Sequence, residues 1–127
     1  MIVRSLTEIS GTEREVDWGN GKSRRFLVAR DNMDFSLTDT VVNAGSRSLL
    51  QYRNHMEACY CITGSGEIED ASTGERFPIR PGTMYALDKH DAHYLIAKED
   101  MRLVCVFSPP LNGDESHKLG LGQSSSY

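Results

Sequence analysis

Residues 52–61 read Y-R-N-H-M-E-A-C-Y-C and join ligand-capable side chains to an apolar run. Successive side chains of a β-strand point to opposite faces, so His55 and Glu57 would share one face of an extended chain. Tyr52 lies an odd number of residues from both and would point the other way, unless a bulge or turn near Asn54 redirects it. The apolar residues that follow are typical of a buried strand. The stretch therefore predicts a site carried by a rigid strand rather than by a free loop.

The chain on both sides of this stretch divides into short segments that predict strands, with turn residues between them. The expected strands cover residues 1–10 (with a short turn), 24–29, 34–43, 48–52, 66–70, 75–79, 83–87, 93–97 and 101–107, and residues 11–23 are expected to form a loop. The segment 101–107 is nearly all apolar, which predicts a central strand buried on both faces. No segment gives a strong helix prediction. We therefore expect an all-β fold, a jelly-roll-like barrel or a sandwich.

The length of 127 residues predicts a single domain, with the barrel over residues 1–111 and a tail over residues 112–127. The tail is rich in Gly and Ser and poor in large apolar residues. Such a composition predicts a flexible segment, and we expect this tail to be a possible lid over a site.

Charge and composition exclude several classes of partner. The formal net charge of -4 and the scattered basic residues argue against a nucleic-acid surface. No apolar run approaches the roughly 18–20 residues that cross a membrane, and the N-terminus lacks the apolar core of a signal peptide. Three cysteines cannot all pair with one another. These features predict a cytoplasmic protein with reduced thiols.

Three places along the chain offer ligands for a divalent transition metal, for which histidine and carboxylate are common ligands. They are the His55/Glu57 pair, Tyr85 after the Pro-Gly turn, and His93 after the D-K-H-D turn. Each alone is weak, because a lone histidine in a β-protein is more often structural. Their order along the chain strengthens the prediction of a metal site. His90 is the alternative ligand to His93.

Other residues allow two interpretations each. Trp18 either closes the edge of the core or forms the aromatic wall of a ligand pocket. The hydroxyl-rich face of residues 34–43 is a binding surface if it points into a barrel, and merely solvated if it points out. Cys59 and Cys61 form a C-x-C pair that suggests zinc, but without a second pair a buried strand is favoured.

Three motifs in order carry a resemblance to a known family. They are N-H-x-E-A at residues 54–58, R-P-G-T-M-Y-A-L-D-K-H-D-A-H at residues 80–93 and C-V-F-x-P-P at residues 105–110. Together they resemble the ectoine synthase family over almost the whole chain, apart from the final ten residues. The resemblance implies a homodimeric cupin-fold lyase that depends on Fe²⁺. It would act on a small molecule, closing the ring of N-γ-acetyl-2,4-diaminobutyrate to ectoine with loss of water.

The same resemblance implies roles for individual residues. The iron ligands would be Glu57, Tyr85 and His93, with His55 a near neighbour of the metal. The substrate pocket would be lined by Arg25, Thr40, Tyr52, Cys105, Phe107, Glu115 and His117. The catalytic candidates would be Tyr52, His55, Glu115 and His117, and the residues alone do not rank His55, Glu115 and His117 as the base.

The implied reaction makes chemical sense, because an amide carbonyl is a poor electrophile that a Lewis acid can polarise. The attacking amine must lose a proton to a base, and water must be excluded from the pocket. Two departures from the family pattern concern the pocket wall and the lid: Gly21 stands where the family usually has tryptophan, and K-L-G-L follows His117. They leave two alternatives, a related metal-dependent cupin with another acylated diamine or a hydrolytic reaction, and a non-catalytic small-molecule-binding cupin.

Overall fold

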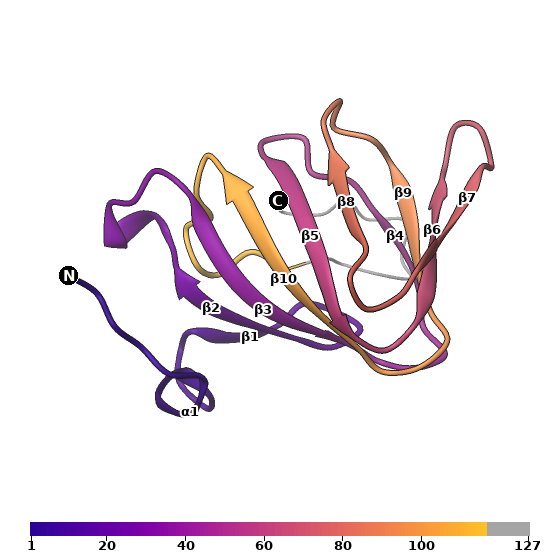
Figure 1. Cartoon of the computed structure of the whole chain (residues 1–127). Helices are drawn as coiled ribbons and strands as arrows, with labels where there is room; N and C mark the ends of the chain where they lie inside the picture. The colour runs from indigo at the N-terminus through magenta and orange to yellow at the C-terminus, as the bar shows by residue number, and fades with distance from the viewer. Residues whose placement is uncertain (117–127) are drawn as a thin grey trace.

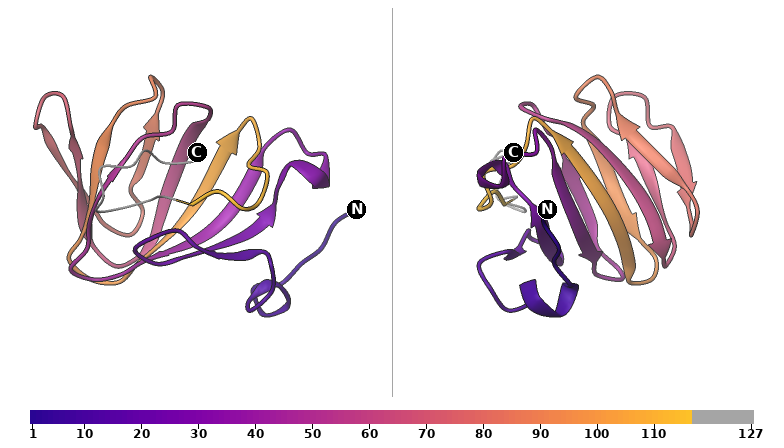
Figure 2. Two further views of the ribbon diagram at one scale, coloured as in Figure 1. Left: turned by 180° about the vertical axis from the view of Figure 1, so that it is seen from behind. Right: turned by 60° about the vertical axis from the view of Figure 1, so that its left-hand side comes forward.

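The computed structural model describes residues 1–116 and shows two antiparallel sheets that face each other across a barrel interior (Figure 1). The six-stranded sheet has the order β1-β2-β3-β10-β5-β8, and the four-stranded sheet has the order β4-β9-β6-β7. Figure 2 shows that the strands of both sheets curve around the same interior. The elements are α1 (Leu6–Ile9), β1 (Glu15–Asp17), β2 (Lys22–Leu27), η1 (Ala29–Asp31), β3 (Ser36–Val42), β4 (Arg47–Leu50), β5 (Met56–Thr63), β6 (Gly66–Asp70), β7 (Arg76–Ile79), β8 (Met84–Leu87), β9 (His93–Ala97) and β10 (Met101–Ser108).

The predicted all-β class is confirmed, and the expected strands from residue 24 onward agree with the observed ones to within a few residues. The prediction is wrong at the N-terminus, where residues 6–9 form the short helix α1 instead of a strand. Ser5 caps this helix, because its side chain accepts a hydrogen bond from the amide of Glu8 at 3.2 Å. The loop expected over residues 11–23 also contains β1 and the start of β2.

Strand β10 is central, as predicted, because it pairs with β3 on one side and β5 on the other. The prediction that it is buried on both faces is wrong for the single chain. Leu103, Cys105 and Phe107 point into the barrel and are buried, whereas Val106 on the outer face is 38% exposed. The apolar sequence of β10 therefore predicts its central position in the sheet, but it does not predict that a second layer covers its outer face.

The hydroxyl-rich face of β3 points into the barrel. Ser36 and Thr38 are buried, and the Oγ1 atoms of Thr38 and Thr40 lie 3.1 Å apart. Asp39, on the opposite face, accepts hydrogen bonds from Arg24 and Arg102 on the neighbouring strands. The inward orientation rules out the solvated interpretation of these hydroxyls, and their role as a binding surface stays a prediction.

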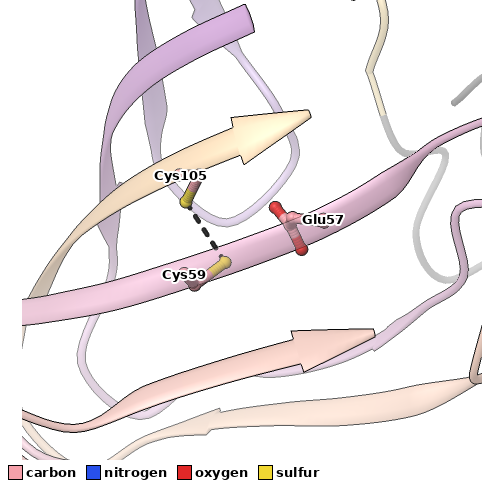
Figure 3. Close-up of side chains that lie close together, drawn as sticks. All are labelled: Glu57, Cys59 and Cys105. Atoms are coloured by element: carbon pink, nitrogen blue, oxygen red, sulfur yellow. Dashed lines mark hydrogen bonds between the residues drawn. The ribbon is translucent and has the colours of Figure 1, made fainter. Parts of the chain in front are cut away.

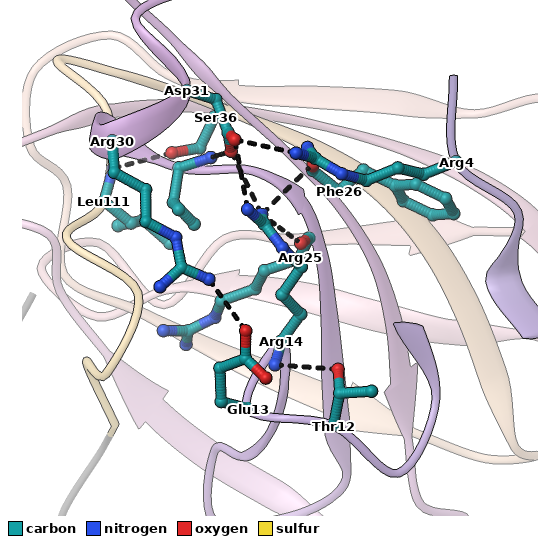
Figure 4. Close-up of polar contacts among 11 residues, drawn as sticks. Arg4, Thr12, Glu13, Arg14, Arg25, Phe26, Arg30, Asp31, Ser36 and Leu111 are labelled. Carbon is teal, nitrogen blue, oxygen red and sulfur yellow. Dashed lines mark hydrogen bonds and ion pairs between the residues drawn. The ribbon is translucent and has the colours of Figure 1, made fainter. Parts of the chain in front are cut away.

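A polar network fastens the N-terminal segment to β2 and η1 (Figure 4). The carboxylate of Asp31 accepts hydrogen bonds from Arg4 at 2.9 Å, from Arg14 at 3.0 Å and from the amide of Val28 at 2.9 Å. Burial alone would raise the pKa of Asp31, but these donors outweigh it and hold the pKa well below its usual range. The network therefore fixes the end of the strand that carries Arg25 into the interior.

Among the described residues, no helix is long and apolar enough to cross a membrane.

Candidate active site

A cavity in the barrel interior collects side chains from both sheets. Its lining residues are Trp18, Ser23, Thr40, Leu50, Tyr52, Glu57, Cys59, Tyr85, Leu95, Leu103, Cys105 and Phe107. The chain bends at Arg53 and Asn54, just before β5 begins. Because of this bend, Tyr52 and Glu57 reach the same cavity although they are an odd number of residues apart. Thr40, Cys105 and Phe107 enter it from the adjacent strands β3 and β10.

Glu57, Tyr85 and His93 come from three strands. Glu57 on β5 and Tyr85 on β8 line the cavity, and Tyr85 also borders a neighbouring hollow that His93 of β9 lines. The rings of Tyr85 and His93 have centroids 6.3 Å apart, and those of Tyr52 and His93 are 6.0 Å apart. Glu57 Oε1 and His93 Nε2 are buried and have no hydrogen-bond partner among the described residues. Buried polar atoms without a partner are rare and require an explanation.

The second ring nitrogen of His93 fixes its tautomer. Nδ1 lies 2.9 Å from the backbone carbonyl of Asp91, which can only accept, so Nδ1 carries the proton. Nε2 is then left with a free lone pair, the usual arrangement of a metal-binding histidine. Burial also lowers the pKa of His93, which keeps the ring neutral near pH 7.

Burial shifts the pKa values of two of these side chains toward their neutral forms. Burial raises the pKa of Glu57 to about 8, and burial also raises the pKa of Tyr85. Both groups are therefore held neutral near pH 7 by the protein alone. A bound cation would reverse this, because it stabilises the ionised forms of its ligands. Carboxylate, phenol and imidazole are donors that suit a divalent transition metal, so the residues fit a metal site.

A second group of potential ligands overlaps the first. Glu57, Cys59 and Cys105 place their ligand atoms within 4.8 Å of one another, and all three side chains are buried (Figure 3). Cys59 and Cys105 are directly opposite each other on β5 and β10.

Arg25 is fully buried on β2 and ties down the first part of the expected tail. Its Nη2 donates to the backbone carbonyl of Glu115 at 2.6 Å, and its Nε donates to Ser23 Oγ at 3.1 Å. The Glu115 carboxylate accepts the amide N–H groups of Asn112 and Gly113 at 2.7 and 2.9 Å. Burial would raise the pKa of Glu115, but these amides and Arg25 outweigh it and lower the pKa. A carboxylate held in this way is a weak base.

His55 lies at the edge of the same region. Its Nδ1 is 2.7 Å from the carbonyl of Pro109 and so donates to it, which leaves Nε2 as an acceptor. The ring packs edge-on against Phe107 and borders a hollow that Glu115 also lines. His117 lies outside the described residues.

Comparison with known proteins decides the family. The ectoine synthase family model matches residues 1–123. The chain belongs to the ectoine synthase family. It is 56% identical over 119 residues to the L-ectoine synthase of Desulfatibacillum aliphaticivorans, covering 92% of each chain. It is 54% identical to the ectoine synthase from P. lautus in a crystal structure, with a TM-score of 0.86, covering 89% of this chain and 81% of that one.

More distant structures support the fold alone. A Cupin 2 conserved barrel domain protein from Salinispora arenicola is 20% identical, with a TM-score of 0.66 over 85% of this chain and 88% of that one. The cupin-type barrel expected from the sequence is thus confirmed.

In this member of the ectoine synthase family, Trp18 is both a core residue and part of the cavity wall. It is buried, its indole N–H donates to the carbonyl of Val41 at 2.9 Å, and it borders the cavity. Gly21 has a φ of 153°, and a Cβ there would lie 1.9 Å from Val41 O and 3.0 Å from Trp18 Nε1. The Val41 carbonyl therefore leaves no room for a side chain at position 21 with this backbone.

The structure also separates the two histidine candidates. His90 is an exposed turn residue with positive φ, and its Nδ1 lies 2.8 Å from the carbonyl of Tyr52. His93 is buried beside Tyr85. This placement favours His93 as the ligand.

Two polar residues of the cavity wall, Ser23 and Cys59, are not among the predicted pocket residues, and Cys59 was expected only in a buried strand. Each lies two residues from a residue already singled out, Arg25 and Glu57, and points to the same face of its strand. The period-two alternation could therefore have found both.

Proposed function

We propose that the protein is an ectoine synthase, a hydro-lyase that closes N-γ-acetyl-L-2,4-diaminobutyrate to ectoine with loss of water. The observation that carries the proposal is the pair of buried, unpartnered ligand atoms, Glu57 Oε1 and His93 Nε2, beside Tyr85 in a member of the ectoine synthase family. The related-cupin and binding-only alternatives have no observation in their favour.

We propose Glu57, Tyr85 and His93 as the ligands of one Fe²⁺ ion. When bound, such an ion supplies Lewis-acid polarisation of a substrate oxygen. The Nδ1–H bond to Asp91 aims the imidazole of His93, and the strand pairing of β5 with β8 holds Glu57 and Tyr85 in register. Carriage of all three proposed ligands on strands supports the proposal, because rigid elements hold ligands in place better than loops do.

The remaining pocket residues divide between positioning and proton transfer. The Thr40 and Tyr52 side chains line the cavity with Cys105, and Phe107 adds an apolar ring to its wall that would help to keep water from the reaction. Arg25 and Glu115 hold each other, which positions residues 112–116 rather than providing a base. Among the described candidates His55 is best suited to accept the amine proton, because its Nε2 is left as an acceptor.

Product analysis tests the proposed reaction. Iron-loaded protein incubated with N-γ-acetyl-L-2,4-diaminobutyrate is expected to form ectoine, detected by chromatography and mass spectrometry as the substrate less one water. Unacetylated L-2,4-diaminobutyrate is the control, since it lacks the acetyl carbonyl that the ring closure requires. Release of acetate without ectoine would instead support the hydrolytic alternative, and binding without turnover would support a binding-only cupin.

We also propose a homodimer that covers the outer face of the six-stranded sheet. Tyr60, Met84 and Val106 are exposed there by 49, 59 and 38%, and the strand pairing places Tyr60 opposite Met84. A contiguous apolar face of this kind is typical of an interface. Light scattering is expected to give twice the mass of the 14.2 kDa chain.

Introducing a charged side chain on this outer face tests the proposed dimer. Tyr60→Lys is expected to shift the mass toward the single chain, because a buried ammonium in an apolar interface is unfavourable. Phe77→Lys is the control, since Phe77 is 46% exposed on the other sheet. A wild-type mass of one chain would refute the dimer.

A further inference from the structure

Two thiols lie side by side in the cavity wall, next to the Glu57 carboxylate (Figure 3). Cys59 of β5 faces Cys105 of β10 across the strand pair, and their Sγ atoms are 3.3 Å apart. Both cysteines are free and buried. A carboxylate oxygen of Glu57 belongs to the same group of potential ligand atoms, and Glu57 Oε1 has no hydrogen-bond partner among the described residues. The wall therefore offers two sulfur ligands and one carboxylate at one place.

We infer that Glu57, Cys59 and Cys105 form a second metal-binding arrangement, suited to a soft divalent cation such as Zn²⁺ or Cd²⁺. Thiolate ligands select such ions, and three protein ligands leave a fourth tetrahedral position open to the cavity. Tetrahedral zinc with Zn–S bonds of about 2.3 Å separates two sulfurs by about 3.8 Å, so a small opening of the thiol pair is enough. The thiol protons are released to solvent when the metal–sulfur bonds form.

This arrangement shares Glu57 with the proposed iron site. Competition between the two ions for Glu57 rests on that proposed function. Two divalent cations that share this one buried carboxylate would repel each other strongly. A cation bound by Cys59 and Cys105 therefore disfavours an ion held by Tyr85 and His93. The carboxylate, phenol and imidazole set is the harder one and favours Fe²⁺, whereas the thiol set favours Zn²⁺. The metal found in the protein then depends on which ion is supplied.

Cadmium alone, added to metal-free protein with a phosphine reductant, tests the inference. Thiolate-to-metal charge-transfer absorption in the ultraviolet is expected to saturate at one ion per wild-type chain. Cys59→Ser and Cys105→Ser are each expected to weaken Cd²⁺ binding at least tenfold and to reduce the absorption. His93→Ala is expected to retain it, because that residue belongs only to the proposed iron site.

Cys61→Ser is the matched control. Cys61 is buried on the same strand and the same face as Cys59, but its Sγ contacts the backbone carbonyl of Thr63 at 3.3 Å. It should leave the absorption unchanged. Absence of the band in wild type, or an equal band in Cys59→Ser and Cys105→Ser, would overturn the inference. Full iron retention by His93→Ala would instead overturn the proposed iron ligands, and the thiolate result would stand.

Discussion

His93→Ala is expected to lower iron content to background and ring-closing activity by about 100-fold or more. Loss of residues that merely support a metal ligand costs 10–100-fold, so loss of a ligand should cost at least the upper end of that range. Glu57→Gln should behave similarly, because it keeps the shape of the side chain and removes the charge that a cation would require. Iron per chain after anaerobic loading and the rate of ectoine formation are the two measurements.

His90→Ala is the matched control for the histidine substitution. It removes an exposed imidazole that is not a proposed ligand and whose Nδ1 lies 2.8 Å from the backbone carbonyl of Tyr52, so iron content should stay at the wild-type level. His55→Ala should reduce activity more than iron content, since its proposed role is proton transfer. The ligand assignment is wrong if His93→Ala and Glu57→Gln both keep full iron occupancy.

A chain that ends at Gly113 is expected to bind iron normally and to form no ectoine. The truncation leaves Glu57, Tyr85 and His93 in place, and it removes Glu115 and His117. It also leaves the buried Arg25 without the carbonyl and carboxylate that it contacts. Because we propose that residues 112–127 close over the occupied pocket, both the closure and the ordering contacts are lost. Iron content, product formation and thermal unfolding of the truncated chain check this.

A chain that ends at His117 separates loss of the closure from loss of the contacts with Arg25. It keeps Glu115 and its contacts with Arg25, and should therefore recover part of the activity. If the shorter chain makes product at the full-length rate, the proposed lid is refuted and the site is complete within the barrel. If it loses iron as well, the Arg25–Glu115 contact supports the metal site rather than the substrate.

Most strands could be predicted from the sequence because alternation and turn residues are local properties. The start of the chain was missed because a serine cap three residues before Glu8 is enough to form one helical turn beside the barrel. The outer face of β10 was misjudged because burial of that face depends on a second layer, which the strand's own residues do not encode.

The candidate site depends on pairings that no local pattern contains. The alternation of β5 gives Glu57 and Cys59 one face, but only the register of β5 with β10 brings Cys105 opposite Cys59. Likewise one partner of the buried Arg25 lies 90 residues away, at Glu115. Such contacts become visible only when the order of strands in the sheets is known.

The carbonyl of Val41 couples positions 18 and 21. It accepts the indole N–H of Trp18 at 2.9 Å, and it would lie 1.9 Å from a Cβ added at Gly21. With this backbone no side chain fits at position 21 unless the segment around Val41 shifts, and that shift would disturb the hydrogen bond that holds the indole. A tryptophan at position 21 would therefore require a different loop path and not a single substitution. The aromatic wall of the cavity is thus a property of the whole loop conformation.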